Sequence, residues 1–276
     1  METDKAHSEL VAEALTLATQ LAREAGAKMR EYRVSGAFEV SLKKPLDLVT
    51  TADLECDRII RAGVAARFPD HRIFSEESSP ETIPSLLASG CTWIVDPIDG
   101  TVNFASGHPS VGVSIGFAVD GRIEAGVIYA PFYDELFSAR RGQGAFLNGN
   151  RMQCRNRDDL KRSLVATGFP ADRSDLKRLV RRLELVLENC QDMRRLGACS
   201  IDICWIAAGR HEAYYESVHP WDIAAAGLIA REAGVITGVV GESSRNHGLP
   251  EDLWCGEYIA AVPGIYTELR AILGRA

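Results

Sequence analysis

The sequence predicts an α+β fold in which two lobes stack in layers. In the first half, apolar runs separated by two-residue turns predict an antiparallel β meander that follows two helices. In the second half, short strands alternate with helices, which is typical of an α/β arrangement. We therefore expect an N-terminal α+β lobe over residues 1–154 and a C-terminal α/β lobe over residues 155–276, joined in one compact unit.

The first half begins with two helices and an extended segment between them. Apolar residues at spacings of three to four predict an amphipathic helix over residues 8–33. Residues 36–51 alternate as an extended segment, and a second helix is expected over residues 53–67. Asp53 stands at the start of that helix. It has the local position of an N-cap, and the alternative is that its carboxylate faces a metal ion.

Paired glutamates end the next apolar segment, which covers residues 73–78. Adjacent side chains on a strand point to opposite faces, so we expect only one of Glu76 and Glu77 to face a site. The alternative is a solvated acidic loop.

The antiparallel meander is expected after residue 109. Apolar runs at 110–119 and 122–130 are joined by Asp120-Gly121, a strong signal for a two-residue hairpin turn. Residues 135–139 and 145–147 continue the pattern. The segment Gly142-Gln143-Gly144 lacks the strand-to-helix context of a phosphate-binding loop, so we interpret it as a turn.

The second half alternates between strands and helices. The expected strands cover residues 163–167, 193–196, 213–216, 235–240 and 258–262. The expected helices cover residues 174–190, 199–208, 221–233 and 265–274.

The segment 93–101 is the most informative stretch of the chain. Its apolar start predicts a buried strand, and Pro97 lacks the amide that a ladder needs, so the strand should end there. Asp96 and Asp99 then project from a tight loop. Two carboxylates so close repel each other unless a cation lies between them, and an oxygen-only shell suits Mg²⁺. Alone, the pattern is more often a plain turn.

A third aspartate precedes a run of small residues. Asp222 falls in the first turn of the helix expected over residues 221–233, ahead of Ala224-Ala-Ala-Gly227. Small residues permit close backbone approach. The carboxylate either satisfies the helix dipole or is a third aspartate at a metal site.

Composition limits the classes of function. The chain has 31 basic and 38 acidic residues and a net charge of −7, which argues against nucleic-acid binding but permits small phosphorylated substrates. No apolar run approaches the length of a membrane span, and the N-terminus lacks a signal-peptide pattern. Seven cysteines without Cys-x-x-Cys are typical of a cytoplasmic protein with reduced thiols, and no His-x-x-x-His pair suggests zinc.

Four segments together resemble the inositol monophosphatase family. They are Asp47-Leu-Val-Thr-Thr-Ala-Asp53, Glu76-Glu77-Ser78, Asp96-Pro-Ile-Asp-Gly-Thr101 and Trp221-Asp222-Ile-Ala-Ala-Ala-Gly227. The resemblance covers residues 8–270. The segment that begins at Asp96 and the segment that begins at Trp221 are highly specific when they occur together. It implies the layered αβαβα sugar-phosphatase fold shared with fructose-1,6-bisphosphatase, and a Mg²⁺-dependent, lithium-sensitive phosphatase.

The resemblance also implies residue roles. One metal ion is expected on Glu76, Asp96 and the carbonyl of Ile98, and a second on Asp96, Asp99 and Asp222. A third, weaker ion involves Glu76. The expected catalytic residues are Glu76 and the pair that orients the attacking water, Asp53 and Thr101. The expected substrate contacts are Gly100, Thr101, Ala198, Cys199, Glu216 and Asp222.

Some positions depart from the family pattern or stay open. Relatives usually carry Gly-Ser/Thr-Ala-Ala where this chain has Gly197-Ala-Cys-Ser200, which leaves its fine specificity open. Either Lys43 or Lys44 matches the family lysine, with a preference for Lys43.

The leading hypothesis is hydrolysis of myo-inositol monophosphates to inositol and phosphate by a metal-activated water. Two cations neutralise charge on the phosphoryl and leaving oxygens, so no nucleophilic side chain is needed. We expect two to three Mg²⁺ ions, with Mn²⁺ as a substitute and Li⁺ and Ca²⁺ as inhibitors, in a homodimer.

Other functions stay open. The same chemistry could act on histidinol phosphate, fructose-1,6-bisphosphate or adenosine 3′,5′-bisphosphate, or the protein could be a non-catalytic, metal-stabilised regulatory or binding protein. The two residues between Asp96 and Asp99 argue against a haloacid-dehalogenase phosphatase, whose Asp-x-Asp motif has one.

Overall fold

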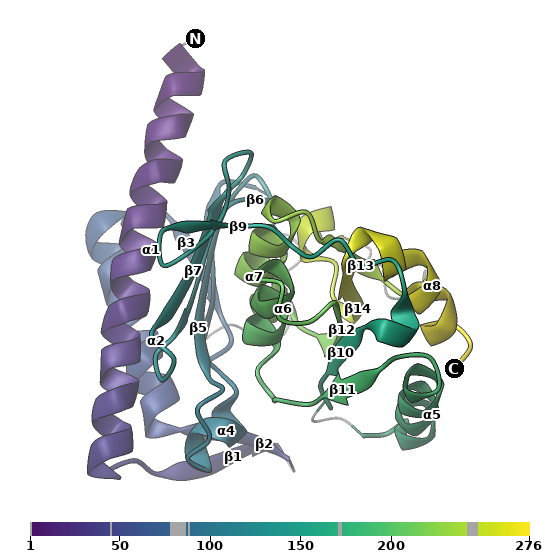
Figure 1. The fold of residues 1–276 in the computed structure, drawn as a ribbon. Helices are drawn as coiled ribbons and strands as arrows, with labels where there is room; N and C mark the ends of the chain where they lie inside the picture. The colour runs from purple at the N-terminus through teal and green to yellow at the C-terminus, as the bar shows by residue number, and fades with distance from the viewer. Residues whose placement is uncertain (1, 45, 78–86, 88, 171–172, 242–247) are drawn as a thin grey trace.

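Helices and sheets alternate in five layers in this protein (Figure 1). The computed structural model describes residues 2–44, 46–77, 87, 89–170, 173–241 and 248–276. From one side to the other, the layers are an outer helix pair, a larger sheet, a central helix pair, a smaller sheet and a second outer helix pair. The predicted layered αβαβα fold is confirmed.

The longer helices of the described residues fall into three pairs. The first outer pair is α1 (Glu2–Ser35) and α2 (Thr51–Arg67), the central pair is α6 (Cys199–Ala207) and α7 (Pro220–Glu232), and the second outer pair is α5 (Leu176–Leu187) and α8 (Pro263–Leu273). Shorter helices in the described part of the chain are α4 (Thr101–Ala105), η1 (Leu160–Arg162) and η3 (Glu251–Leu253). The long expected helices are all present, whereas the short ones were not predicted because a single turn has no periodicity.

The larger sheet is the predicted meander. Within the described residues its order is β3-β4-β5-β6-β7-β8-β9, and only β3 and β4 are parallel. The strands are β3 (Arg72–Ser75), β4 (Cys91–Asp99), β5 (Gly112–Val119), β6 (Arg122–Ala130), β7 (Glu135–Arg140), β8 (Gly144–Leu147) and β9 (Asn150–Met152). Asp120 and Gly121 have φ values of 50° and 77°, so the expected hairpin turn is confirmed.

The smaller sheet is mixed. Its order in the described part of the chain is β11-β10-β12-β14-β13, with β14 antiparallel to both neighbours. The strands are β10 (Leu164–Thr167), β11 (Asp192–Arg194), β12 (Ala213–Val218), β13 (Ile236–Val239) and β14 (Gly256–Ala261). A separate hairpin pairs β1 (Val40–Lys44) with β2 (Asp47–Thr50). The division into lobes at residues 154 and 155 stays a prediction.

The strand that carries the central aspartates does not end at its proline. β4 continues through Pro97 to Asp99, so the prediction that it ends at Pro97 is wrong. Asp96 pairs with Ser114 and Asp99 with Gly112, and the register shifts between them. Pro97 is tolerated because the irregular segment needs no ladder amide from it.

Helix α7 lies directly on the backbone of the larger sheet. A Cβ atom on Gly116 would lie 2.9 Å from the Cβ of Ala224, and one on Gly126 would lie 2.8 Å from the Cα of Ala225. Only glycine on the strands and alanine on the helix permit this approach. The start of α7, with Asp222, therefore reaches the sheet closely.

The other end of α7 is also fixed to the sheet. The amides of Gly142 and Gly144 each donate to the Glu232 carboxylate at 2.7 Å. Glu232 is the last residue of α7, and the two glycines lie at the turn between β7 and β8. The interpretation of this segment as a turn is confirmed, and the anion that it binds is a side chain of the protein itself.

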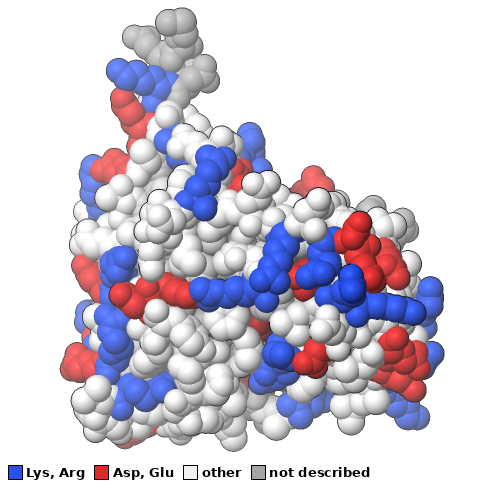
Figure 2. Space-filling model, viewed as in Figure 1, with Lys and Arg blue, Asp and Glu red and all other residues white. Residues whose placement is uncertain are grey.

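Two further observations concern the helices as possible membrane spans and the charge of one face. Among the described residues, no helix is both long and apolar enough to span a bilayer. On the face seen in Figure 2, basic and acidic side chains are interspersed.

We predict that Gly126→Ala lowers the free energy of unfolding by about 1–3 kcal/mol, because the new methyl group overpacks against Ala225. Urea denaturation followed by circular dichroism measures the change. Gly274→Ala is the matched control, since a Cβ there would meet only carbonyl oxygens at 3.5 Å or more. Equal stability of both variants would contradict the close seating of α7.

Candidate active site

Four acidic residues converge at the end of β4. Asp96 and Asp99 lie on β4 itself, Asp222 lies in the first turn of α7, and Glu76 follows β3, where its amide donates to the carbonyl of Val95 at 3.1 Å. Asp96 is 2% exposed. Burial, and then the charges of Glu76, Asp99 and Asp222, raise the pKa of Asp96 well above its usual range. The structure therefore brings together the four carboxylates that the sequence predicted as metal ligands.

Helix α6 supplies the donors for Asp99. The amide of Cys199 donates to Asp99 Oδ1 at 3.1 Å, and the amide and hydroxyl of Ser200 donate to Oδ2 at 2.7 and 2.5 Å. Burial still raises the pKa of Asp99, although the bonds from Ser200 oppose this effect. Sequence reasoning missed Ser200. Its signal was a serine in the first turn of a predicted helix, where amides bind anions.

Asp222 closes the first turn of α7. The amide of His219, the N-cap residue, donates to Asp222 Oδ2 at 2.6 Å. Ser114 on β5 donates its hydroxyl to the carbonyl of Trp221 at 3.0 Å and ties this turn to the larger sheet. Burial and the charge of Asp99 raise the pKa of Asp222 well above its usual range. Asp222 therefore satisfies its helix and also faces the other aspartates.

Asp53 and Thr101 form the pair that the resemblance implied. Thr101 Oγ1 lies 2.9 Å from Asp53 Oδ1 as a donor and 3.2 Å from the carbonyl oxygen of Ile98. The N-cap of α2 is Thr50, whose amide and hydroxyl donate to Asp53 Oδ2 at 2.8 and 2.6 Å. The N-cap interpretation of Asp53 is therefore wrong, because the helix begins earlier than expected. Burial raises the pKa of Asp53.

Both glutamates after β3 contact one lysine. Lys43 Nζ lies 2.9 Å from Glu76 Oε1 and 2.5 Å from Glu77 Oε1. The two side chains therefore do not point to opposite faces, because both residues follow the end of β3 and lie in a turn, and the expectation that only one of them faces a site stays a prediction. Burial raises the pKa of Glu77 to about 7. Burial lowers the pKa of Lys43, but the effect of the two glutamates is larger, so the pKa of Lys43 is raised overall.

These contacts favour Lys43 as the family lysine. The side chain of Lys44 and the whole of Ser78, which belongs to one of the motifs, lie outside the described residues.

Gly100 lets two loops meet beside the aspartates. It has a φ of 92°, and a Cβ atom there would lie 3.0 Å from the carbonyl oxygens of both Gly197 and Ser110. Asn103 joins the same loops, since its Nδ2 donates to the carbonyls of Ser110 and Leu196 at 2.7 Å each. The predicted substrate residues Gly100 and Ala198 therefore lie side by side, and Asn103 is a further positioning residue that the sequence did not reveal.

Glu216 lies on β12 at one end of a cavity. Tyr214 donates its hydroxyl hydrogen to Glu216 Oε2. Burial raises the pKa of Glu216 to about 7, although the hydrogen bond from Tyr214 opposes this effect. The cavity has a volume of about 220 Å³ and runs from Glu216 along α5.

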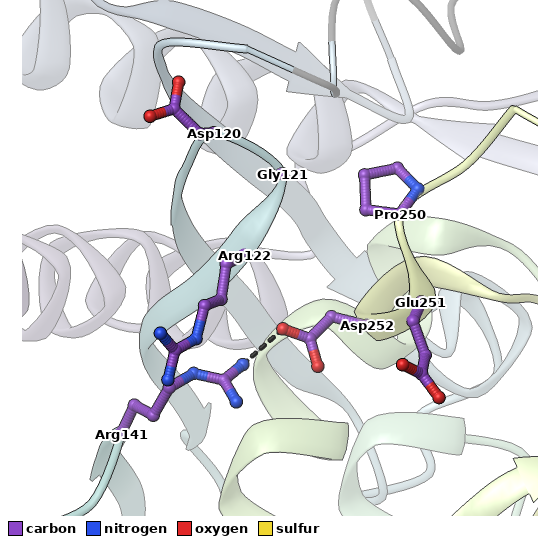
Figure 3. A pocket seen from close by; sticks show the side chains of 7 residues that line it. All are labelled: Asp120, Gly121, Arg122, Arg141, Pro250, Glu251 and Asp252. Atoms are coloured by element: carbon purple, nitrogen blue, oxygen red, sulfur yellow. Dashed lines mark hydrogen bonds and ion pairs between the residues drawn. The ribbon is translucent and has the colours of Figure 1, made fainter.

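A second cavity, of about 290 Å³, lies between the turn of the β5–β6 hairpin and η3 (Figure 3). Its lining residues include none of the predicted site residues. Asp252 on its wall is paired with Arg141 and accepts from the amide of Ile123 at 3.0 Å. The Asp252 carboxylate on the wall of this cavity therefore already has partners within the protein.

The donor set fits a hard divalent cation in its chemistry. Mg²⁺ prefers oxygen ligands, and buried carboxylates that raise one another's pKa gain stability when a cation lies between them. Among the described residues, no three His, Cys, Asp or Glu side chains already have the arrangement that holds a metal ion. Asp96 Oδ1 accepts from the amide of Ile98 at 3.1 Å, and Asp99 and Asp222 are likewise held by protein donors.

The histidine behind α6 is uncharged. His211 Nε2 lies 2.5 Å from the carbonyl oxygen of Asp202, and burial lowers the pKa of His211 to about 4. The Asp202 carboxyl is buried with no hydrogen-bond partner among the described residues, and burial raises its pKa well above the usual range.

The layered αβαβα fold and the buried carboxylates that meet at the end of β4 define a class of protein with an acidic centre. The sequence matches the model of the inositol monophosphatase family over residues 10–272. The chain belongs to the inositol monophosphatase family. Membership supports a phosphatase and a general dependence on metal ions.

Similar proteins span nearly the whole chain. "Nus factor SuhB" of Pasteurella multocida is 37% identical over 92% of this chain and 93% of its own length. Human "Inositol monophosphatase 1" is 36% identical over 93% of this chain and 92% of its own length. The structure of the extragenic suppressor protein SuhB of Bartonella henselae matches with a TM-score of 0.85 and 33% identity, covering 96% of this chain and 99% of that one.

We predict that His211 makes the protein less stable as the pH falls from 6.5 toward 4. The folded-state pKa of about 4 lies below the ordinary value of 6.5, so the unfolded chain binds more protons in this window. The contribution to the free energy of unfolding is full above pH 6.5 and falls by at most about 3 kcal/mol by pH 4.

Urea denaturation of the wild type and of His211→Gln at several pH values measures the contribution of His211, which is the difference between their free energies of unfolding. The raised pKa of Asp202 acts in the opposite direction in both proteins and cancels. His7→Gln, at an exposed histidine, is the control. Parallel stability curves for the wild type and His211→Gln would refute the assignment.

Proposed function

We propose that this protein is a Mg²⁺-dependent phosphomonoesterase that hydrolyses myo-inositol monophosphates to inositol and phosphate. The observation that carries the proposal is the convergence of Glu76, Asp96, Asp99 and Asp222 at the end of β4. Family membership supports it, and so does the contact between Asp53 and Thr101.

Two metal ions would bind to carboxylates that this fold already brings close together. Glu76, Asp96 and the carbonyl of Ile98 would hold one ion, and Asp96, Asp99 and Asp222 the other, with a weaker third ion at Glu76. When bound, such ions neutralise charge on the phosphoryl and leaving oxygens and lower the pKa of water. Mn²⁺ is expected to substitute, whereas Ca²⁺ and Li⁺ are expected to inhibit.

The side chains near Asp53 would prepare a water molecule for direct attack. The single hydroxyl hydrogen of Thr101 points to Asp53, with the carbonyl oxygen of Ile98 as the other acceptor in reach, so the hydroxyl oxygen keeps lone pairs that can accept a hydrogen bond from a water molecule. Asp53 is fixed by Thr50 and cannot turn away. The two residues would therefore orient a water on one side of the phosphorus, while the amides of Gly100 and Thr101 would touch the phosphate.

The leaving group would lie toward the smaller sheet. Glu216 lines the cavity along α5 and would accept hydrogen bonds from substrate hydroxyls. Ala198 and Cys199 would contact the substrate nearer the aspartates, because Ala198 lies beside Gly100 and the Cys199 amide donates to Asp99. Histidinol phosphate, fructose-1,6-bisphosphate and adenosine 3′,5′-bisphosphate are the alternative substrates, and a panel of these compounds separates them.

A second role is suggested by one relative. The Pasteurella multocida protein is called a Nus factor, so a binding function could accompany catalysis or replace it. The complete set of acidic side chains favours catalysis, because uncompensated buried carboxylates are costly. The homodimer and the cytoplasmic location stay predictions.

We predict that Asp96→Asn and Asp99→Asn each lower kcat/KM on myo-inositol 1-phosphate by about a thousandfold or more, because each removes a charged metal ligand. Phosphate release measures activity, and circular dichroism checks the fold. Asp134→Asn, at a largely exposed aspartate, is the control and should keep full activity. Activity retained in both site variants would overturn the metal assignment.

We also predict that turnover of myo-inositol 1-phosphate requires Mg²⁺, stops with EDTA and falls on addition of Li⁺. Mg²⁺-dependent turnover of another phosphate alone would keep the chemistry and change the substrate. Full activity with Ca²⁺ would contradict a tight two-metal site, since the larger Ca²⁺ shell fits it poorly. No turnover on the whole panel would favour the binding role.

A further inference from the structure

The Glu216 carboxylate is held from its own strand. Glu216 lies on β12, between β10 and β14. Residues i and i+2 of a strand lie on the same face, which places the Tyr214 ring beside the Glu216 carboxylate. Tyr214 is fully buried and donates its hydroxyl hydrogen to Glu216 Oε2. Because the Tyr214 ring is held in the core, the bond fixes the orientation of the carboxylate.

The neighbouring strand shapes the space for the same carboxylate. Thr167 on β10 pairs with Tyr215, so Gly168 comes next, beside Glu216. A Cβ atom on Gly168 would lie 1.7 Å from Glu216 Oε2 and 2.5 Å from Oε1. Gly168 is not among the glycines with a positive φ, so its backbone suits alanine. A side chain at residue 168 is therefore excluded by the Glu216 carboxylate and not by the backbone conformation.

Contacts also connect Glu216 to the acidic centre. The Cys199 thiol lies beside the Tyr214 hydroxyl, and the Cys199 amide donates to Asp99 Oδ1 at 3.1 Å. A continuous path of contacts therefore runs from Asp99 through Cys199 and Tyr214 to Glu216. The position of Glu216 is thereby set relative to the aspartates, where the phosphate is expected.

We propose that Tyr214 is a positioning residue that, together with Gly168, aims Glu216 so that the enzyme selects phosphate esters whose leaving group carries a hydroxyl. The inference rests on the proposed function. Tyr214 binds Oε2, and within the described part of the chain no donor reaches Oε1. Oε1 is therefore the acceptor for a substrate hydroxyl. An ester without hydroxyls gains nothing from it.

The test compares kcat/KM for myo-inositol 1-phosphate, which carries hydroxyls, and for p-nitrophenyl phosphate, which has none. We expect Tyr214→Phe to lower kcat/KM on the inositol ester about tenfold and on the aryl ester by less than about twofold, as expected for one hydrogen bond to a charged group. Gly168→Ala should reproduce this selective loss, because its methyl group displaces the carboxylate.

A double-mutant cycle separates positioning from a structural role. If Tyr214 acts only through Glu216, Tyr214→Phe causes no further loss of selectivity in a Glu216→Ala background. Tyr266→Phe on α8 removes a hydroxyl away from the site and is the matched control.

Equal losses on both esters, or unchanged selectivity in both variants, would overturn the inference while leaving the phosphatase proposal intact. A wild type that turns over neither ester with Mg²⁺ would overturn the proposed function and this inference together.

Discussion

Repulsion among buried carboxylates is the constraint on which the rest of this structure depends. Asp96 and Asp99 are nearly inaccessible to water, and Glu76 and Asp222 add charge beside them. The protein reduces the cost with donors, namely the amides and hydroxyl at the start of α6 and the N-cap amide of α7. These donors offset only part of the cost, because burial and then the neighbouring charges keep the pKa values of the three aspartates raised. The balance is what a bound cation would supply.

Close packing of α7 makes this arrangement possible. Glycines on β5 and β6 face the alanines of α7, so the helix approaches the sheet at backbone distance. Ser114 ties the first turn of the helix to β5, and Glu232 ties its last turn to the β7–β8 turn. The small residues therefore do more than fill the core. They set the distance between Asp222 and the two aspartates of β4. A larger side chain at this contact would push α7 away from the sheet and increase that distance.

The acidic centre and the substrate side are connected through α6. Its first turn binds Asp99, and the same turn carries the Cys199 thiol that contacts Tyr214. Metal binding and recognition of the leaving group would thus share one short helix. The departure from the family pattern at Ala198, Cys199 and Ser200 falls at this junction, where Ser200 adds a hydroxyl donor to Asp99.

Periodicity and turn chemistry in the sequence were sufficient to predict the long helices, the meander and the alternation of the second half, because each depends on neighbours within a few residues. The motifs around Asp53, Asp96 and Asp222 were likewise visible, because the segments together match one family pattern, although each alone is typical of an ordinary cap or turn. Tertiary structure alone decided that β4 passes through Pro97, that Thr50 caps α2, and that Lys43 reaches both glutamates. It also decided the partners Ser200, Asn103 and Tyr214. Ser200 and Asn103 contact residues far apart from them in the chain, and Tyr214 meets Glu216 only because both side chains lie on one buried face of β12. No local pattern records which groups will lie opposite one another once the layers close.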